Sequence, residues 1–444
     1  MTGPRRFTPK LARQLTAAAL AALLAGAAHA QALVELYEAA RAYDATYLAA
    51  RAQADAAEYR AAQADALALP TLAANLKGVG TQVDLPGGRS GDNNALQGNL
   101  NGRMPLFNRA NQATIEQAQR SLIAAKAELE AAEQDLIIRL AQAYFDVLSA
   151  KDDVALAEAN KAYILEQLAS AKRNFEVGTA TITDAREAQS RADLAAAQQI
   201  AADNALINRR IALAYLVGQR GVEPLPLATP VMLPKVVPAN VEEWVAVADT
   251  VHPQVTRTRV AFEMARLEID KAKAGLLPTV DAVASVGANK ASGDSIIPGT
   301  TRSASVGVEL NWPIYTGGAV QNRISETVAL EQRSREEFEN ARRTVAQNTR
   351  VAYFSVQSGE ALVKALEAAE ASSRLSLEAT QLGYKVGVRV NIDVLNAQTQ
   401  LFQTRRDLFK SRYDVLVNSL RLRQASGQLT PNDLLAVNSL LARP

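Results

Sequence analysis

The sequence contains two copies of one unit, and this internal duplication constrains the fold more than any other feature. When the chain is shifted against itself by about 208 residues, Leu69-Pro70-Thr71 meets Leu277-Pro278-Thr279. After one inserted residue near Thr316-Gly317-Gly318, the offset becomes about 209 residues. Further matches then follow in order: Tyr144-Phe145 with Tyr353-Phe354, Val177-Gly178 with Val386-Gly387, Asp184 with Asp393, Ala188-Gln189 with Ala397-Gln398, and Gly218-Gln219 with Gly427-Gln428. Matching proline, glycine and aromatic residues in one order indicate a tandem duplication, with a period too long for a solenoid repeat.

The two copies organise the chain. The predicted parts are a signal peptide at 1–30, a first repeat at 31–220, a proline-rich linker at 221–240, a second repeat at 241–428 and a C-terminal tail at 429–444. The linker contains Pro224, Pro226, Pro230, Pro234 and Pro238. Because proline lacks an amide hydrogen and ends helices, we expect the linker to be an extended connector, with a disordered linker as the alternative.

The first thirty residues have the composition of an export signal. A basic start, with Arg5, Arg6, Lys10 and Arg13, precedes an apolar run from Leu15 to Ala27. Ala28-His29-Ala30 follows with the small-x-small pattern of a signal-peptidase site, so we expect Gln31 to be the mature N-terminus. A transmembrane anchor is the alternative, but the apolar run is too short to span a bilayer comfortably.

Composition excludes several classes of function. The chain has no cysteine, so an exported form has neither disulfides nor a lipid-modified cysteine. His252 is the only histidine after the signal peptide, which leaves no nucleophile–histidine triad and no His/Cys metal site. We therefore expect no enzyme and no cofactor. The formal net charge is +2 with both signs interspersed, which argues against a nucleic-acid partner.

Four segments, about 71–83, 95–104, 279–288 and 303–312, alternate apolar with small or polar side chains. In the last segment Val306, Val308 and Leu310 alternate with Gly307 and Glu309. One apolar and one polar face over about ten residues is typical of a transmembrane barrel strand, although a strand of a soluble sandwich is the alternative. Four strands are too few to close a barrel, and lipid does not tolerate an open sheet edge, so we expect several chains to share one barrel.

The remaining sequence predicts very long helices. Residues 111–174 and 320–382 form uninterrupted helical patterns, in which Leu140, Val147 and Val154 recur every seven residues. The helices predicted at 33–67, 184–217, 241–276 and 393–426 are about half as long. Laid end to end, two short helices match one long helix, and the linker, mature N-terminus and tail would gather as a belt at mid-height. A purely structural coiled coil explains the helices but not the four strands.

Local motifs then suggest a family. The runs that carry the resemblance are Leu382 to Arg389 (LGYKVGVR), Asn391 to Ala397, Gly427-Gln428-Leu429, Asp433 to Asn438, and Phe175 to Gly178 followed by Thr183-Asp184. With these motifs the chain resembles the TolC family of outer-membrane export channels over essentially its whole mature length. The resemblance implies a homotrimer with a twelve-stranded outer-membrane β-barrel, four strands per chain, continuous with a long periplasmic α-helical barrel.

The resemblance also implies partners and a gate. The partners are a periplasmic adaptor protein, an inner-membrane ABC or proton-driven transporter, and outer-membrane lipid. The implied gate network at the periplasmic end comprises Thr183, Asp184, Tyr384 and Arg389, and the implied pore constriction lies at Asp393 and Asn396. The residues alone predict that Asp184 and Asp393 stabilise helix N-termini. For Tyr384 the alternative role is core packing, and for Arg389 it is a solvated surface charge.

The constriction departs from the best-known pattern of the family. In a trimer, Asp393 would form a ring of three carboxylates, which favours cations and can bind divalent ions. Asn396 stands where that pattern has a second aspartate, so we expect weaker cation block.

The predicted function is export, with type I secretion favoured because the chain has no acylated cysteine. Multidrug efflux is the alternative.

Overall fold

The computed structural model describes residues 32–85, 89–228, 231, 233, 235–293 and 299–442. The predicted signal peptide, Gln31, and Pro230 and Pro234 of the linker lie outside these residues. The chain divides into two compact units, each of which takes residues from both repeats. Unit 1 comprises the described residues up to Leu48, with Glu133–Trp244 and the residues from Asn348 onward. Unit 2 comprises Ala49–Ala132 and Val245–Gln347.

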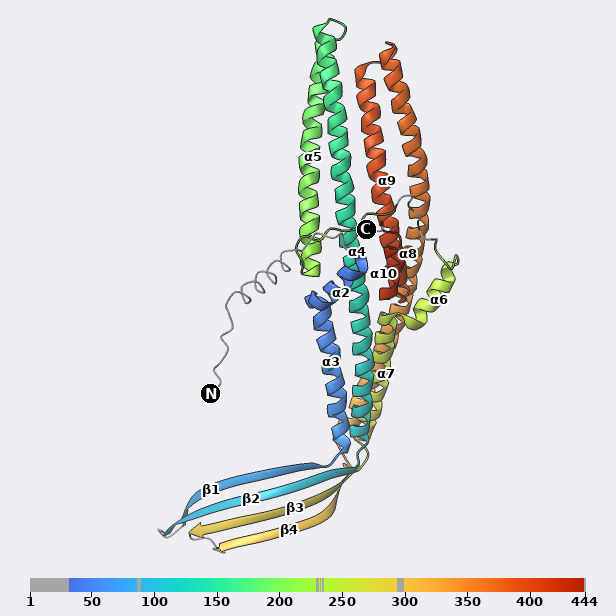
Figure 1. The fold of residues 1–444 in the computed structure, drawn as a ribbon. Coiled ribbons are helices and arrows are strands. Elements are labelled where there is room, and N and C mark those ends of the chain that lie inside the picture. Colours follow the sequence, from blue (N-terminus) through green and yellow to red (C-terminus); the bar gives the residue numbers. More distant parts are fainter. Residues whose placement is uncertain are drawn as a thin grey trace, which may run out of the picture. The chain divides into compact units, whose positions relative to one another are not determined.

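Unit 2 contains one antiparallel sheet of four strands, β1 (Thr71–Leu85), β2 (Arg89–Phe107), β3 (Thr279–Gly293) and β4 (Gly299–Asn311) (Figure 1). The strands pair in chain order, so the hairpin of the first repeat joins the hairpin of the second through β2 and β3. A representative pair across this junction is Asn101 with Ser285. β2 and β3 extend beyond the segments in which the sequence alternates clearly.

The two faces of the sheet differ in polarity. The register places large apolar side chains together on one face, where all of them are exposed: Leu72, Leu76, Leu96, Leu100, Met104, Val286, Val306, Val308 and Leu310. The opposite face carries polar contacts. Arg103 donates to Asp281 at 2.6 Å, and the hydroxyl groups of Ser285 and Ser305 lie 2.8 Å apart. The side-chain alternation of the sequence therefore becomes one apolar and one polar face.

Helices make up the rest of unit 2. They are α3 (Ala45–Asp65) from residue 49, the first part of α4 (Arg109–Glu176), α6 (Val241–Val251) from residue 245, α7 (Pro253–Ala274) and the first part of α8 (Ala319–Lys385). Ion pairs join them: Arg120 with Glu263 at 3.1 Å and Arg323 with Glu268 at 2.7 Å. Phe262 and Phe338 stack with ring centroids 6.4 Å apart. Of the helices in the described part of the chain, none is both long and apolar enough to cross a membrane.

Each of the short helices predicted to open a repeat is in fact two helices, so that prediction is wrong. In the first repeat α2 (Leu33–Tyr43) and α3 meet at Asp44, whose backbone is extended. The Asp44 carboxylate accepts from the Tyr47 amide at 2.8 Å. It also binds the Arg139 guanidinium at 2.9 and 3.1 Å. These contacts lower the pKa of Asp44, and the hydrogen bond from Arg139 has the largest effect. They also offset the loss of helical hydrogen bonds at the break.

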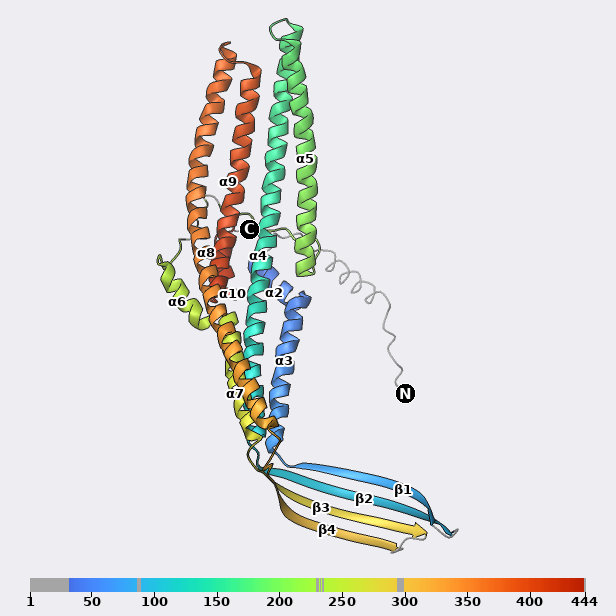
Figure 2. The ribbon, with the colours of Figure 1, turned by 180° about the vertical axis from the view of Figure 1, so that it is seen from behind.

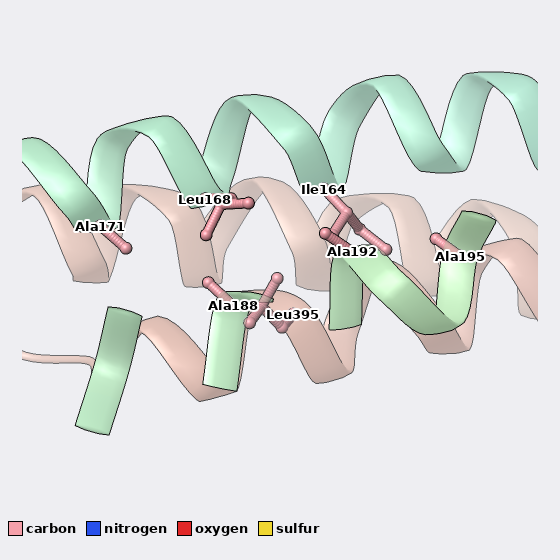
Figure 3. Packing of buried hydrophobic residues seen from close by; sticks show 7 residues of the cluster. All are labelled: Ile164, Leu168, Ala171, Ala188, Ala192, Ala195 and Leu395. Atoms are coloured by element: carbon pink, nitrogen blue, oxygen red, sulfur yellow. The ribbon is translucent and has the colours of Figure 1, made fainter. Parts of the chain in front are cut away.

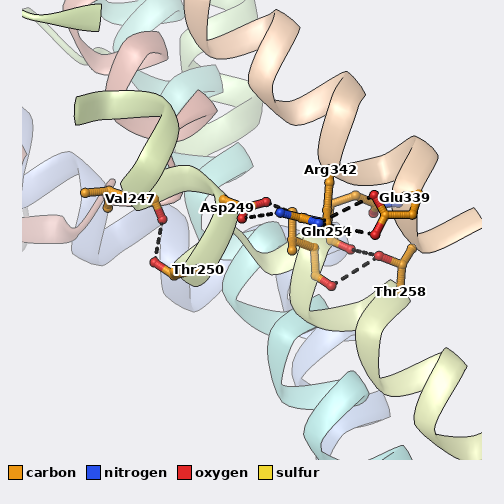
Figure 4. A network of polar contacts seen from close by, with 8 residues as sticks. Val247, Asp249, Thr250, Gln254, Thr258, Glu339 and Arg342 are labelled. Atoms are coloured by element: carbon orange, nitrogen blue, oxygen red, sulfur yellow. Dashed lines mark hydrogen bonds and ion pairs between the residues drawn. The ribbon is translucent and has the colours of Figure 1, made fainter. Parts of the chain in front are cut away.

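The second break, between α6 and α7, has a different cause. Pro253 is the first residue of α7, and proline disfavours the helical region for the residue before it, here His252. The His252 Nδ1 accepts from the Gln254 amide at 3.1 Å and so caps α7. Just before the break, Asp249 of α6 binds Arg342 of α8 through two hydrogen bonds of 2.6 and 2.7 Å (Figure 4). Arg342 also reaches Glu339 at 3.2 Å.

Unit 1 is built from two helical hairpins. The second part of α4 pairs with α5 (Ile182–Val217), and the second part of α8 pairs with α9 (Asn391–Ala425). Alanine allows α4 and α5 to approach closely: Ile164, Leu168 and Ala171 face Ala188, Ala192 and Ala195, with Leu395 of α9 beside them (Figure 3). A close approach of two helices is expected where small residues replace large ones in a coiled-coil core.

The linker and the tail lie together in unit 1. Leu227 of the linker forms a β-bridge with Leu441, and the Ala442 amide donates to the Pro226 carbonyl at 2.7 Å. The tail forms α10 (Pro431–Asn438), and Asn438 accepts from the Leu33 amide at 3.2 Å. Tyr144, fully buried in α4, donates to the Leu225 carbonyl at 3.1 Å. These described linker segments are therefore held by backbone hydrogen bonds and by the core of α4.

Candidate functional site

The candidate site is formed by the two turns that close the hairpins of unit 1 and by the helical residues next to them. Gly178 and Gly387 occupy equivalent positions in these turns, with φ of 79° and 80°. After each glycine, an amide bonds back to a carbonyl in the last turn of the preceding helix: Thr179 to Asn174 at 2.8 Å and Val388 to Gly383 at 2.9 Å. Glycine takes left-handed dihedrals without a steric penalty, so these helix ends close compactly.

Asp184 stabilises the start of α5. Thr181 is the N-cap residue, and its hydroxyl accepts from the Asp184 amide at 3.2 Å. In return the Asp184 carboxylate accepts from the Thr181 amide at 3.0 Å and from its hydroxyl at 2.7 Å. This reciprocal pair is a capping box, and it confirms the predicted helix-stabilising role of Asp184. Thr183, from the predicted gate network, is exposed beside it.

Asp393 occupies the equivalent place in α9 but makes a different contact. The N-cap residue of α9 is Val390, whose side chain cannot accept a hydrogen bond. Asp393 instead forms an ion pair with Arg389 at 3.6 Å, and its side chain is 36% exposed. The hydrogen-bonded capping seen at Asp184 is therefore not repeated at Asp393. The carboxylate still lies in the first turn of α9, where it complements the helix dipole.

Four polar contacts join one hairpin to the other near these turns. The Asn174 amide donates to the Tyr384 hydroxyl at 3.3 Å, and the Arg191 guanidinium donates to Asn396 at 3.1 Å. Farther from the turns, Gln381 donates to the Tyr163 hydroxyl at 2.8 Å, and Gln398 donates to Asn160 at 3.3 Å. Each contact links a residue of the first repeat to a residue of the second, and none pairs two charged side chains.

The predicted gate residues are thus close in the fold but bind different partners within one chain. Tyr384 contacts Asn174, Arg389 contacts Asp393, and Asp184 is engaged by its own turn. Sequence reasoning missed Asn174 and Arg191. The duplication does contain an indication of both residues. An offset of about 209 residues pairs Asn174 with Gly383 and Arg191 with Gln400, so the two repeats differ in side-chain chemistry at these positions.

A second group of contacts, here called the α4–α9 interface, lies farther along the hairpins. Tyr413 donates to Asp152 at 2.6 Å, Arg406 pairs with Asp153 at 3.2 Å, and Arg421 donates to Gln142 at 2.9 Å. The rings of Phe145 and Tyr413 lie 5.7 Å apart. Burial raises the pKa of both aspartates above the usual carboxyl value.

No group of three or more histidine or acidic side chains in the described part of the chain is arranged to hold a metal ion. The contacts that the site does show are hydrogen bonds and ion pairs within and between helices. Such contacts can form and break as helices move, without covalent change.

Comparison with known proteins gives consistent results. The family profile described as outer membrane efflux protein matches residues 36–219 and 246–428, one segment in each repeat. Outer membrane protein TolC of Vibrio cholerae is 30% identical over 94% of this chain and 95% of its own length. The proteases secretion protein PrtF of Dickeya chrysanthemi is 29% identical over 93% of this chain and 92% of its own. The solved structure of outer membrane protein VceC from Vibrio cholerae superposes with a TM-score of 0.76 at 21% identity, covering 89% of this chain and 96% of that one.

Proposed function

This chain belongs to the outer membrane efflux protein family, and from that membership we propose that three copies form an export channel through the outer membrane. Membership confirms the family resemblance that the sequence motifs indicated. The observation that carries the proposal is the four-stranded sheet, with nine large apolar side chains exposed on one face. A lipid-facing sheet cannot leave its edge strands β1 and β4 unpaired, so other copies must continue it. Three copies give about twelve strands, enough for a closed barrel.

The direct test is the mass and conductance of the purified protein. In detergent we expect the mass of three chains by light scattering, and in a planar bilayer we expect discrete conductance steps. A protein that is purely a coiled-coil envelope component would be soluble without detergent and would not conduct. A monomer mass, or an absence of conductance from a correctly folded trimer, would contradict the proposal.

We further propose that the hairpin turns bind a periplasmic adaptor, which couples the channel to an inner-membrane ABC or proton-driven transporter. The support is apolar exposure: Val177, Val386 and Val388 are 73%, 66% and 78% exposed at the turns. Exposed valines on a compact glycine turn offer a surface for an apolar partner. Cysteine placed at Val177 or Val386 should cross-link to a co-expressed adaptor, while cysteine at the exposed Tyr59 of α3 should not.

In the trimer, Thr183, Asp184, Tyr384 and Arg389 are the proposed gate network, and Asp393 and Asn396 the proposed constriction. The four hairpin-to-hairpin contacts would hold the resting form. Replacing Tyr384→Phe together with Arg389→Glu should open the resting channel, because it removes a hydroxyl and reverses a charge at this end. Unchanged single-channel conductance in the double variant would rule out this network.

Of the two kinds of export, we favour type I secretion. A relative that matches over nearly its full length bears the name proteases secretion protein, although the family description speaks of efflux. The two functions separate in a host that lacks its own channel. Restored secretion of a protein substrate, in the presence of its transporter and adaptor, would support type I secretion. Restored drug resistance without protein secretion would favour the efflux alternative.

A further inference from the structure

Two basic side chains lie at one end of the apolar face of the sheet. On β3 this face carries only apolar side chains before Lys290: Val280, Ala282, Ala284, Val286 and Ala288. On β4 the corresponding run beside Arg302 is Leu310, Val308, Val306 and Ala304. Because the side chains of a strand alternate between the two faces, Lys290 and Arg302 belong to the same face as these residues. Each cation therefore directly follows an unbroken apolar run.

The two cations lie far from the helices of unit 2. All four strands join those helices at one end of the sheet, and the end of β3 and the start of β4 lie at the other (Figure 1). Lys290 is close to Gly293, the last residue of β3, and Arg302 is close to Gly299, the first residue of β4.

The length of the apolar run matches the thickness of a membrane. At about 3.4 Å per residue, β3 covers about 34 Å from Val280 to Lys290. A tilt of about 40° reduces this to about 26 Å along the barrel axis, close to the apolar band of about 25 Å in transmembrane barrels. In the proposed channel the helices extend into the periplasm, so Lys290 and Arg302 would lie at the outer leaflet.

Lys290 and Arg302 are also neighbours on adjacent strands. Lys290 is opposite Thr300 and Arg302 is opposite Ala288, so the two basic residues form a diagonal pair. Side chains in such pairs start about 7–8 Å apart, within reach of each other. Both side chains are exposed. The nearest acidic side chain described on this face is Asp92, about 14 Å along β2 from the residue opposite Lys290.

A phosphate group would balance this local excess of positive charge. Cations on the lipid face destabilise a barrel, although the cost falls near the membrane interface. Two cations side by side also repel each other. Phosphate oxygens accept hydrogen bonds from ammonium and guanidinium groups, and a guanidinium can bind them in a bidentate manner. Lipid headgroups place phosphates at the height of Lys290 and Arg302.

The first repeat has neutral residues at the equivalent positions. A shift of 208 residues pairs Lys290 with Gln82 and Arg302 with Asn94, and the two hairpins have the same register under this shift. A general requirement of strands at this height would act on both repeats. The basic pair is specific to the second hairpin, which indicates a local binding site.

We propose that Lys290 and Arg302 bind the phosphate groups of lipopolysaccharide, the phosphorylated glycolipid in the outer leaflet of outer membranes. The acyl chains of the bound lipid would lie along the apolar face, between the site and the membrane centre. This inference rests on the proposed channel and names a lipid partner for it. A trimer would carry three such sites, one on each second hairpin.

Binding of purified lipopolysaccharide to the detergent-solubilised protein tests the site directly. The parent protein and the variant Lys290→Gln with Arg302→Gln are titrated with fluorescent lipopolysaccharide in a buffer without divalent cations. We expect the variant to bind at least tenfold more weakly. Dephosphorylated lipopolysaccharide should bind the parent protein as weakly as the intact lipid binds the variant, because the cations recognise phosphate.

The sheet offers two matched controls. Lys77→Gln removes a lysine from the opposite, polar face of β1, and it should change the affinity less than twofold. The triple variant Gln82→Lys, Asp92→Thr and Asn94→Arg builds the basic pair into the first hairpin, with Asp92 replaced by the equivalent of Thr300. This variant should bind about twice as much lipopolysaccharide at saturation.

The outcomes separate this site from the proposed channel. A conducting trimer in which Lys290→Gln with Arg302→Gln leaves lipopolysaccharide binding unchanged would overturn the site and leave the channel intact. Phosphatidylglycerol that binds the parent protein as tightly as lipopolysaccharide would overturn the assignment to the glycolipid. A monomer mass would remove both the site and the channel.

Discussion

Single residues at the α4–α9 interface show how burial sets the chemistry of this region. Asp152 faces the Tyr413 hydroxyl at 2.6 Å, whereas Asp153 faces the Arg406 guanidinium at 3.2 Å. Burial raises the pKa of each carboxyl and is the largest effect. The Tyr413 hydroxyl lowers the pKa of Asp152, and the Arg406 guanidinium lowers that of Asp153. Burial and the hydrogen bond to Asp152 raise the pKa of Tyr413 as well, so its hydroxyl stays protonated and remains a donor. In the Asp152–Tyr413 contact a carboxylate therefore accepts a charge-assisted hydrogen bond from a neutral hydroxyl.

This contact predicts an unusual pH dependence. A carboxyl whose pKa is higher in the folded than in the unfolded state binds more protons when folded, so its contribution to stability falls as pH rises through that window. We expect the thermal midpoint of the protein to have a component that decreases as pH rises above the ordinary pKa of an aspartate. Asp152→Asn should reduce that component, leaving the part due to Asp153 and Asp414, whose pKa values burial also raises.

Tyr413→Phe is the informative control for this prediction. It removes the donor that stabilises the Asp152 carboxylate, so the pKa of Asp152 should rise further and the pH window should move upward. At neutral pH the variant should lose about 1–3 kcal/mol, because a buried acceptor loses its partner. Thermal midpoints that do not depend on pH in the parent protein, or an identical profile for Tyr413→Phe, would show that this pair does not titrate as described.

At this scale the sequence predicted local contacts better than distant ones. The helix-stabilising role of Asp184 followed from its position after a turn, because capping involves residues only three apart. The contacts of Asn174 with Tyr384 and of Arg191 with Asn396 join residues about 200 positions apart. They depend on the register in which two hairpins pack, and helical periodicity does not specify that register.

At the scale of helices and strands, the repeat and the side-chain periodicity predicted most elements. The four strands, the two long helices and both helices that follow the turns occur near their expected positions. The breaks at Asp44 and His252 were not anticipated. At Asp44 the compensating partner is Arg139, about 95 residues away in the chain, so local propensity contains no sign of it. At His252 the sequence does contain a sign, because Pro253 disfavours the helical region for the residue before it.

Helix ends offer a second prediction, through two glycines with the same backbone but different surroundings. Gly218 ends α5 with φ of 74°, and a Cβ built there would lie 2.5 Å from the Tyr43 ring. Gly178 has φ of 79°, and nothing lies within 4 Å of a Cβ at that position. Gly178→Ala should therefore cost only the left-handed backbone penalty, about 1–2 kcal/mol. Gly218→Ala should lower the thermal midpoint clearly more.

Removing the ring isolates the steric part of this effect. In a Tyr43→Ala background the penalty for Gly218→Ala should fall to that of Gly178→Ala, because only the backbone term is left. Thermal midpoints of the four variants, with hydrogen exchange at the end of α5, provide the measurement. Equal effects of the two glycine substitutions in the parent protein would mean that Tyr43 moves aside freely.

At the scale of the whole molecule, the duplication explains why one chain has both buried and exposed versions of the same surface. Within a chain α4 and α9 pack together (Figure 2), with Phe145 and Leu416 buried, whereas the equivalent positions Phe354 of α8 and Ile207 of α5 are exposed. The two versions differ in chemistry, since Asp153 and Arg406 correspond to Leu362 and Ala197. In the proposed trimer, three copies of every turn residue would surround one axis.

The last prediction concerns such a ring, because its charge exists only in the assembly. In the proposed trimer, the proposed constriction at Asp393 would have three carboxylates, and Asn396 would add no charge. Within each chain Arg191 donates to Asn396 at 3.1 Å, so Asn396→Asp would place a new carboxylate beside a guanidinium. We expect this variant to gain only part of the cation selectivity of a second ring. Asn396→Asp with Arg191→Gln should gain more, because the neutral amide keeps a donor without the charge.

Reversal potentials in a salt gradient and block by a divalent cation measure both effects, with Asp393→Asn as the control that loses them. Equal selectivity of the single and double variants would show that Arg191 does not neutralise this position in the channel.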